Sequence, residues 1–191
     1  KQILDKYRKE PLEEPYYPLR VYCTECGKDY TEVTGYDGEY TVEYHCEECG
    51  EDRSLDFRNG NVKPPWRVDW PMRWRYEGVD FEPAGKEHSA AGGSRDTANE
   101  LVEQVFDGEI PVHQMYEFVT RDGAKISSSS GEDVFDLSQL KEIYSPEIIR
   151  FLFASTKPNK AFEIPFESEE IFQRYDNFDK IESAYFNPEE A

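Results

Sequence analysis

A lysine followed by hydroxyl side chains, Lys125-Ile126-Ser127-Ser128-Ser129-Ser130-Gly131, is the first stretch of the chain whose residue types suggest chemistry. The ammonium is a compact positive charge, and serine hydroxyls and backbone N–H groups donate to oxyanion oxygens. Gly131 permits a close backbone approach. The segment therefore suits a polyphosphate. A solvated Ser-rich linker is the alternative, but a flexible spacer rarely stands between an apolar run, here 114–120, and amphipathic helices.

A second candidate for anion binding is Gly92-Gly93-Ser94-Arg95-Asp96-Thr97. Ser94 is expected to cap a helix from about Arg95 to Phe106, which would leave Gly92 and Gly93 where N–H groups point outward at a helix N-terminus. An apolar run at 79–81 precedes this segment, and the run at 114–120 follows it. Strand, glycine loop, helix and strand make a βαβ unit, in which ligands bind at the carboxyl ends of the strands.

The four cysteines form two matched pairs, each followed by glycine: Cys23-Thr24-Glu25-Cys26-Gly27 and Cys46-Glu47-Glu48-Cys49-Gly50. A hairpin is expected between them, with strands at 30–36 and 39–44 and a turn at Asp37-Gly38. Four thiolates held in this way are typical of a closed, structural zinc site. Disulfides are the alternative. His45 adjoins Cys46 and is interpreted as a bystander.

Aromatic and basic residues gather between 59 and 81. Val68-Asp69 is interpreted as a short strand, and Pro71 as the first turn of a helix that runs to about Tyr76. Three tryptophans recur at four-residue spacing, and we expect two of them to pack in the core. Three arginines in so acidic a chain suggest a bound anion. These residues are Trp66, Trp70 and Trp74, with Arg67, Arg73 and Arg75.

The pattern after the Ser-rich segment is helical. Short helices are expected at 137–144 and, after the cap Ser145 and Pro146, as far as about Ser155. A third begins at Ser168, where apolar residues recur at three- and four-residue steps and form one face. The members of that face are Ile171, Tyr175, Phe178, Ile181 and Tyr185.

The totals limit the classes of function. A chain of 191 residues with 37% hydrophobic and 15% aromatic content can bury a core. It has no apolar run of membrane-spanning length and no signal peptide, so a cytoplasmic protein without a membrane partner is expected. It opens at Lys1 on a polar helical stretch, 1–10, and is interpreted as an excerpt.

The formal net charge of −19 is unusual. It disfavours a nucleic-acid partner at ordinary salt, because such binding is driven mainly by Lys and Arg neutralising phosphates. Either the chain never meets nucleic acid, or it works in concentrated salt, where the screening length falls to about 3 Å at 1 M. An acidic surface also keeps a protein soluble. A halophilic, salt-adapted protein is therefore expected.

Taken together and in order, these motifs resemble the class I lysyl-tRNA synthetases of the archaeal and bacterial type. The resemblance covers nearly the whole chain, including both cysteine pairs. Its residues are 66–74, Phe81-Glu82-Pro83-Ala84-Gly85-Lys86-Glu87-His88, 92–97, Tyr116-Glu117-Phe118, the Lys125 segment and Lys157-Pro158-Asn159-Lys160. Within the Lys125 segment two residues depart from the family's pattern: Ile126, where methionine is usual, and Ser128, where many class I enzymes carry a second lysine. Glu87 stands at a position that is usually Asp.

The resemblance implies an α/β fold: the second half of a Rossmann catalytic domain with a small zinc-knuckle β insertion and a following helical stem-contact region. The implied divisions are a helical lead-in at 1–15, the zinc insertion at 16–58, the catalytic half with a KMSKS-like loop at 59–136, and the stem-contact region at 137–191. An ATP-binding HIGH-type signature and an anticodon-reading domain do not occur in this chain, so the excerpt alone is expected to be inactive.

The resemblance also implies ATP-dependent activation of lysine to lysyl-adenylate and transfer to tRNA(Lys), with Mg²⁺ accompanying ATP. Lys125, Ser127 and Ser129 would be catalytic. ATP or adenylate would be bound by Lys125, Ile126, Ser127, Ser128, Gly92, Gly93 and Asp96, and lysine by Trp66, His88 and Tyr116. Structural zinc would be held by Cys23, Cys26, Cys46 and Cys49.

Two other interpretations stay open at this point. One is a class I synthetase for glutamate or cysteine, against which the run from Trp66 to Trp74 argues. The other is a non-catalytic zinc-ribbon module that binds RNA or protein. That module would explain the cysteines but would leave the Lys125 segment and the glycine pair without a role.

Overall fold

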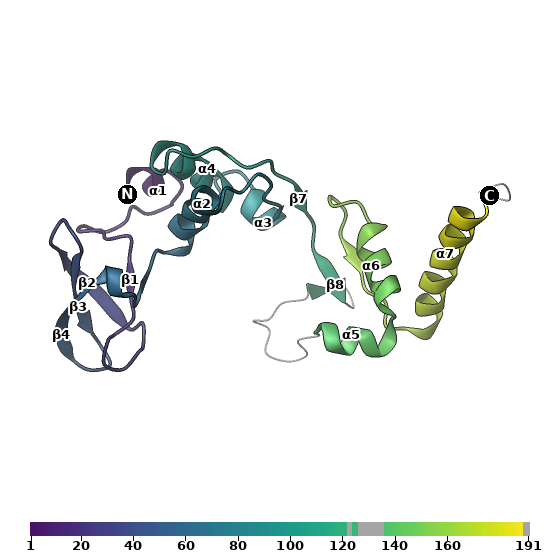
Figure 1. Cartoon of the computed structure of the whole chain (residues 1–191), viewed down its shortest axis with the longest axis horizontal. Coiled ribbons are helices and arrows are strands. Elements are labelled where there is room, and N and C mark those ends of the chain that lie inside the picture. Colours follow the sequence, from purple (N-terminus) through teal and green to yellow (C-terminus); the bar gives the residue numbers. More distant parts are fainter. Residues whose placement is uncertain (122–123, 126–135, 189–191) are drawn as a thin grey trace. The chain divides into compact units, whose positions relative to one another are not determined.

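The computed structural model describes residues 1–121, 124–125 and 136–188, whose helices and strands are labelled in Figure 1. The chain divides into two compact units, one formed by 1–82 with 87–113 and the other by 83–86 with 114–191. The architecture is mixed α/β, with the cysteines gathered in a small antiparallel sheet. No helix in the described part is long and apolar enough to cross a membrane.

A three-stranded antiparallel sheet carries the cysteine pairs. Its order is β2 (Thr31–Tyr36), β3 (Thr41–Cys46), β4 (Glu51–Asp56), with β3 in the centre. Alternate residues of β3 are buried, as the two-residue period of a strand requires, and they pack with Leu55 and with Val21. Val21 belongs to β1 (Arg20–Val21), which pairs antiparallel with β5 (Val62–Lys63).

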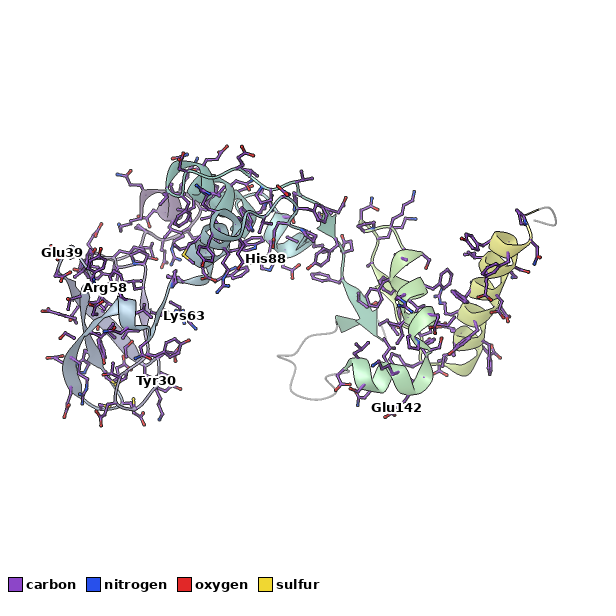
Figure 2. All side chains as sticks on the ribbon, viewed as in Figure 1. Tyr30, Glu39, Arg58, Lys63, His88 and Glu142 are labelled. Carbon is purple, nitrogen blue, oxygen red and sulfur yellow. The ribbon has the colours of Figure 1, made fainter. Side chains whose placement is uncertain are left out.

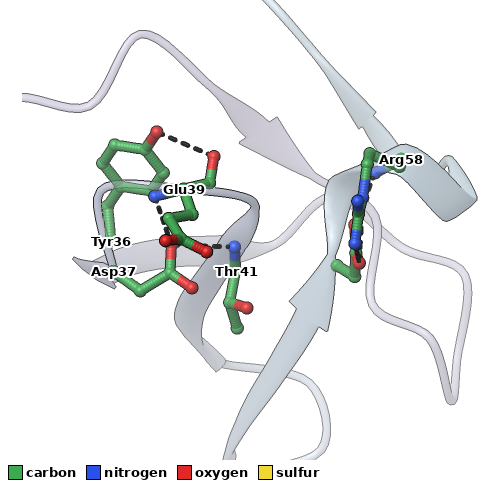
Figure 3. Close-up of polar contacts among 6 residues, drawn as sticks. Tyr36, Asp37, Glu39, Thr41 and Arg58 are labelled. Carbon is green, nitrogen blue, oxygen red and sulfur yellow. Dashed lines mark hydrogen bonds and ion pairs between the residues drawn. The ribbon is translucent and has the colours of Figure 1, made fainter.

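The expected hairpin and its turn are confirmed. The carboxylate of Asp37 accepts hydrogen bonds from the N–H groups of Glu39 and Thr41, at 2.8 and 3.0 Å (Figure 3). These bonds hold the pKa of Asp37 below its ordinary value. Gly38 has φ +85°, a left-handed conformation that favours glycine. The turn residues therefore fix the register of β2 on β3.

Helix α2 (Trp66–Glu77) corrects the expectation of a strand at 68–69 and a helix start at Pro71, because Pro71 lies inside it. The helix follows the short 3₁₀ turn η1 (Phe57–Asn59) and β5. An interior proline loses one backbone hydrogen bond, at a cost of about 3 kcal/mol. Within this helix Trp66 stacks on Trp70, and Trp74, on the other side of the proline, meets Trp70 edge to face.

Helix α4 (Ser94–Gln104) packs against α2 and against α1 (Gln2–Lys6). The N-cap is Gly93, not Ser94, and the N-terminal helix ends at Lys6 instead of continuing to residue 10. The ammonium of Lys6 and the hydroxyl of Tyr7 both donate to Glu100 of α4. The helical part of this unit is thus joined by the tryptophan face of α2 and by polar contacts from α1.

Among the described residues of the second unit there are two small sheets. β6 (Ala84–Gly85) pairs with β7 (Met115–Tyr116) in parallel, and α3 (Lys86–Ser89) and α4 lie between them in the sequence, so a strand–helix–strand order is present, with its first strand at 84–85 instead of the expected 79–81. Residues 79–81, however, form no buried strand: Phe81 is 55% exposed and makes a single parallel bridge to Val112. β8 (Val119–Arg121) pairs antiparallel with β9 (Ala124–Lys125) and parallel with β10 (Phe162–Glu163).

Three helices complete this unit: α5 (Leu137–Ile143), α6 (Pro146–Ala154) and α7 (Ser168–Phe186). Ser145 caps α6 and Pro146 occupies its first turn, as the sequence predicts. Leu140, Tyr144, Ile148, Ile149, Leu152 and Ile164 form the core, against which Ile171, Tyr175 and Phe178 of α7 pack. The apolar face of α7 is only partly covered, because Ile181 and Tyr185 are exposed.

Candidate metal centre and substrate site

The four cysteine sulfurs converge on one point. Cys23 and Cys26 lie on the turn between β1 and β2, Cys46 ends β3, and Cys49 lies on the turn before β4. All four sulfurs are within 4.8 Å of one another, and Cys23 to Cys49 and Cys26 to Cys46 are each 3.8 Å apart. A tetrahedral site with zinc–sulfur bonds of about 2.3 Å has sulfur–sulfur edges of about 3.8 Å.

These distances exclude a disulfide, in which the sulfurs are about 2.05 Å apart, and all four residues are free cysteines. The expected pairing of knuckles around a shared centre is confirmed, and the residues fit a four-coordinate zinc ion. Four protein ligands leave no open position for substrate, so such an ion is structural. His45 lies outside the cluster, with Nδ1 2.8 Å from Oδ1 of Asp52.

The backbone of each knuckle is shaped by its glycine. Gly27 and Gly50 have φ of +71° and +69°, and their N–H groups donate to the carbonyls of Cys23 and Cys46. This turn aims the N–H groups of Cys26 and Glu25 at the sulfur of Cys23 and lowers the pKa of that thiol to about 6.

The thiol of Cys49 has the opposite shift in pKa. The hydrogen bond with the Cys26 side chain, with burial, raises the pKa of Cys49 to about 12. A divalent cation reverses this effect, because a coordinating thiol is deprotonated outright. The cluster therefore has the donors for zinc but needs the ion's charge to hold all four sulfurs as thiolates.

A stack of aromatic rings forms the second candidate site. Trp66 lies parallel to Trp70, with ring centroids 5.1 Å apart and planes at 16°, and Trp74 meets Trp70 edge to face at 4.9 Å. Trp70 and Trp74 are buried, whereas Trp66 is 52% exposed. The expectation that two of the three tryptophans serve the core is thus confirmed, and Trp66 presents an open indole.

His88 completes this aromatic cluster. Its ring lies 6.0 Å from Trp66 and 5.9 Å from Trp70, centroid to centroid, at tilted angles. It is half-buried within α3, at the end of the Gly85-Lys86-Glu87-His88 segment, and is labelled in Figure 2. An exposed indole beside an imidazole offers an apolar wall with a negative ring face, which attracts an ammonium.

Buried polar groups position the stack. Trp70 Nε1 donates to Oε1 of Glu82 at 2.9 Å, and the guanidinium of Arg95 lies 4.5 Å from the ring centroid of Trp74. Arg95 also donates to the carbonyls of Pro111, at 2.6 Å, and Glu82, at 3.3 Å. Its burial lowers the pKa of this guanidinium. Together these contacts tie α2, α4 and the segments around residues 82 and 111 to one another.

Neither Arg95 nor Glu82 is found as a positioning residue by reading the sequence. Arg95 stands in the first turn of α4, where acidic residues are usual because of the helix dipole. An arginine in that position was the one available signal. By contrast, Arg73 is not a free anion ligand: its Nε is 2.8 Å from Oδ2 of Asp69, and its Nη1 is 3.9 Å from Glu77.

The glycine loop before α4 is closed by its own contacts. The N–H of Gly92 donates to Oδ2 of Asp96 at 2.7 Å, and the N–H of Gly93 donates to the carbonyl of Ala90 at 2.8 Å. The expectation that both N–H groups point outward to a ligand is therefore wrong. A Cβ on Gly93 would lie 2.7 Å from the carbonyl oxygens of His88 and Ala90, so the loop admits no side chain there.

The other site residues predicted from the sequence lie in the second unit. Tyr116 is in β7 and is 47% exposed. Lys125 ends β9, whose backbone is paired with β8, while Ile126, Ser127, Ser128 and Ser129 lie outside the described residues. The structure thus brings together Trp66 with His88 and Gly92 with Asp96, each within the first unit.

Comparison with known proteins places these features in a family. A family model described as "tRNA synthetases class I (K)" matches residues 1–191. Proteins named "Lysine--tRNA ligase" from Borreliella burgdorferi and Thermococcus kodakarensis are 50% and 49% identical to the chain over its whole length. The protein of that name from Methanocaldococcus jannaschii is 38% identical over 97% of the chain.

The chain spans 36% of the length of the relative from Borreliella burgdorferi and 37% of that from Thermococcus kodakarensis. The match nevertheless covers the cysteine cluster, the aromatic stack and the βαβ segment without interruption. The chain belongs to the class I (K) family of tRNA synthetases.

Proposed function

We propose that the intact gene product is a class I lysine–tRNA ligase, which activates lysine with ATP and transfers it to tRNA(Lys). The observation that carries this proposal is that relatives bearing the name "Lysine--tRNA ligase" match the entire chain at up to 50% identity. Their names favour lysine over glutamate or cysteine as the substrate, and a family of ligases is favoured over a zinc-ribbon binding module.

The reaction has two steps that balance without a protein nucleophile. An oxygen of the lysine carboxylate attacks the α-phosphorus of ATP, and the bond to pyrophosphate breaks. A terminal ribose hydroxyl of tRNA then attacks the carbonyl carbon of lysyl-adenylate and loses its proton. The new ester bond forms as the bond to AMP breaks. Both steps depend mainly on placement of the reactants and on stabilisation of developing negative charge.

The lysine substrate is assigned to Trp66, His88 and Tyr116. The support is the open indole of Trp66 beside the His88 ring, at 6.0 Å between centroids, since an ammonium is attracted to an aromatic face. The hydrogen bond from Trp70 to Glu82 and the Arg95 contacts hold the stack, so the Trp66 ring is preorganised. Because the ring is already ordered, substrate binding does not carry the conformational-entropy cost of ordering it.

The nucleotide is assigned to Gly92, Gly93 and Asp96 and to the segment Lys125–Ser129. Because Asp96 accepts from Gly92, its role in this proposal is to hold the loop shape. The N–H groups in the first turn of α4, which begins at Ser94, have no partner within the helix and can donate to an anion. Lys125 stabilises charge on the departing pyrophosphate, with Ser127 and Ser129 as hydroxyl donors and Ile126 and Ser128 contributing backbone N–H groups. Mg²⁺ accompanies ATP as its counter-ion.

The domain scheme is part of the same proposal: a lead-in at 1–15, a zinc insertion at 16–58, the second half of a Rossmann catalytic domain at 59–136 and a stem-contact region at 137–191. The parallel pair β6–β7 with α4 between the strands in sequence supports the Rossmann assignment. Zinc is proposed to be purely structural, since four thiolates complete its coordination.

The decisive experiment is ATP–pyrophosphate exchange with the intact gene product across the set of amino acids. Exchange that depends on lysine, with glutamate and cysteine inactive, is the expected result. Exchange stimulated by another amino acid would replace the substrate assignment. A protein that binds zinc but shows no exchange with any amino acid would favour the binding-module interpretation.

A further inference from the structure

A hollow of about 330 Å³ lies where α2 begins, between that helix and the paired strands β1 and β5. It is lined by two prolines and by Arg20, Lys63, Trp66, Asp69 and Arg73. All of these residues belong to the first unit. Neither the zinc cluster nor the lysine position proposed above uses Arg20 or Lys63, and Figure 2 shows Lys63 projecting from the edge of the zinc-bearing part.

Two cations lie side by side in the lining of this hollow. Arg20 and Lys63 are direct cross-strand partners in the β1–β5 pair, and both are exposed. Like charges directly opposite each other destabilise a strand pair. Within the described residues, neither forms an ion pair with a carboxylate, although the chain has 41 acidic residues and 22 basic ones. An anion between them would remove the repulsion.

The charge of the hollow matches an anion of low charge. Arg73 is neutralised by Asp69, 2.8 Å away, so that pair adds no net charge. Arg20 and Lys63 remain, each with one positive charge. The Lys63 ammonium is 5.0 Å from the ring centroid of Tyr22, an aromatic contact that directs it without neutralising it. Two cations suit the single charge of a phosphodiester better than the four charges of a free nucleoside triphosphate.

An aromatic platform adjoins the cations. The Trp66 indole is 52% exposed although it stacks on Trp70, so about half of its surface stays open, and the hollow is lined by Trp66 but not by His88. Bases of single-stranded nucleic acid stack on aromatic rings, at about 1–3 kcal/mol per base, while neighbouring cations follow the backbone. Cations and a stacking ring side by side are the combination that such a strand requires.

We propose that this hollow binds the single-stranded end of an RNA, with a phosphodiester between Arg20 and Lys63 and a base against Trp66. The inference rests on the proposed function, because RNA is the acceptor of the activated amino acid. Trp66 then borders both the lysine substrate and the accepting strand. The local pair of cations also explains how a chain of net charge −19 contacts a polyanion.

The test measures binding of a fluorescein-labelled, six-nucleotide single-stranded RNA to the intact gene product by anisotropy, at several salt concentrations. Arg20→Gln and Lys63→Gln are each expected to weaken binding about tenfold, as for loss of one charged hydrogen bond. The slope of log K against log salt should become shallower by about 0.7 for a lost phosphate contact.

Arg58→Gln is the matched control. Arg58 is an exposed arginine of the same zinc-bearing part, but it is paired with Asp56 and lies 3.9 Å from the Tyr40 ring centroid. RNA binding by this variant should equal that of the parent. Unchanged binding in Arg20→Gln and Lys63→Gln, or an equal loss in Arg58→Gln, would overturn the assignment. The assignment would also be overturned if ATP or inorganic phosphate, at the same concentration as the RNA, displaced the RNA.

Lysine-dependent ATP–pyrophosphate exchange separates this inference from the proposed function. Both hold if Arg20→Gln and Lys63→Gln exchange normally but bind RNA weakly. If the parent shows no exchange, the proposed function is contradicted whatever the result of the RNA-binding measurement. If exchange is normal and RNA binding is insensitive to both substitutions, the hollow is not the RNA site while the ligase assignment stands.

Discussion

The indole Nε1 of Trp70 donates to Oε1 of Glu82 across 2.9 Å, which joins the middle of α2 to the segment that enters β6. Trp70 is buried, and its ring supports Trp66 on one side and Trp74 on the other. One hydrogen bond therefore fixes the angle of the whole aromatic stack.

Removing this donor should destabilise the first unit. Trp70→Phe keeps a ring but leaves the Glu82 carboxylate without its indole partner, at an expected cost of about 1.5–3 kcal/mol. Glu82→Gln retains an amide oxygen as acceptor and should cost less. Urea unfolding monitored by circular dichroism gives both values. A loss for Glu82→Gln as large as that for Trp70→Phe would contradict this account, because the amide oxygen can still accept the indole hydrogen bond.

Loss of one zinc ligand should unfold the cysteine-bearing sheet. Structural zinc contributes about 10–16 kcal/mol of apparent binding free energy in small zinc modules, so Cys26→Ser is expected to bind no stoichiometric zinc. His45→Ala is the control, because His45 contacts Asp52 and not the cluster. Metal analysis and the NMR dispersion of β2–β4 check this prediction. A folded, zinc-free sheet in the parent would contradict it.

A methyl group at Gly93 should distort the loop before α4. The added Cβ would lie 2.7 Å from two backbone carbonyl oxygens, which cannot rotate away as a side chain can. We expect Gly93→Ala to lower the rate of lysine-dependent exchange at least about tenfold, since small misplacement of reacting groups is costly. Gly92→Asn is the comparison: that site has φ +75° and open space, and asparagine tolerates it.

Acid should release α1 from α4. Hydrogen bonds from Lys6 and Tyr7 lower the pKa of Glu100 in the folded chain. A lowered carboxyl pKa means that this docking is fully stabilising above the ordinary pKa of glutamate, about 4.3, and is lost as pH falls through the folded value. Chemical shifts of Leu4 and Tyr7 followed against pH report the release. Glu100→Gln should show no transition in that range.

Lys125→Ala in the intact gene product should slow adenylate formation and leave lysine binding nearly unchanged. The ammonium is assigned to charge that develops on pyrophosphate, which forms only after lysine is bound. Pre-steady-state adenylate formation and calorimetric titration of lysine provide the two readouts. Collapse of lysine affinity with normal chemistry would place Lys125 at the amino acid instead.

Local signals in the sequence predicted the local structure well. The spacing of the cysteine pairs and the Asp37-Gly38 turn specify the metal-binding sheet, because each turn is determined by residues next to it in sequence. The cap Ser145, followed by Pro146, similarly places the start of α6. A cap acts within one helical turn, so no distant contact is needed to recognise it.

Long-range effects defeated the same reasoning elsewhere. Pro71 was expected to start a helix, yet α2 continues through it, and the rings of Trp70 and Trp74 meet from either side of it. Arg95 is buried, and it donates to the backbone carbonyls of residues 82 and 111. No pattern near residue 95 in the sequence reveals these distant partners. The sequence does not reveal that the Gly92 N–H is bound by Asp96, because that contact depends on side-chain orientation.

The apolar cluster under the cysteine-bearing sheet and the cluster beneath α5–α7 have no residue in common. Each can lose its packing without exposing the other's side chains, and only the first contains cysteines of the proposed zinc site. Heating is therefore expected to yield overlapping calorimetric transitions, with a measured enthalpy larger than the van't Hoff value. A chelator should shift one of them alone, so a single midpoint temperature will not describe this chain.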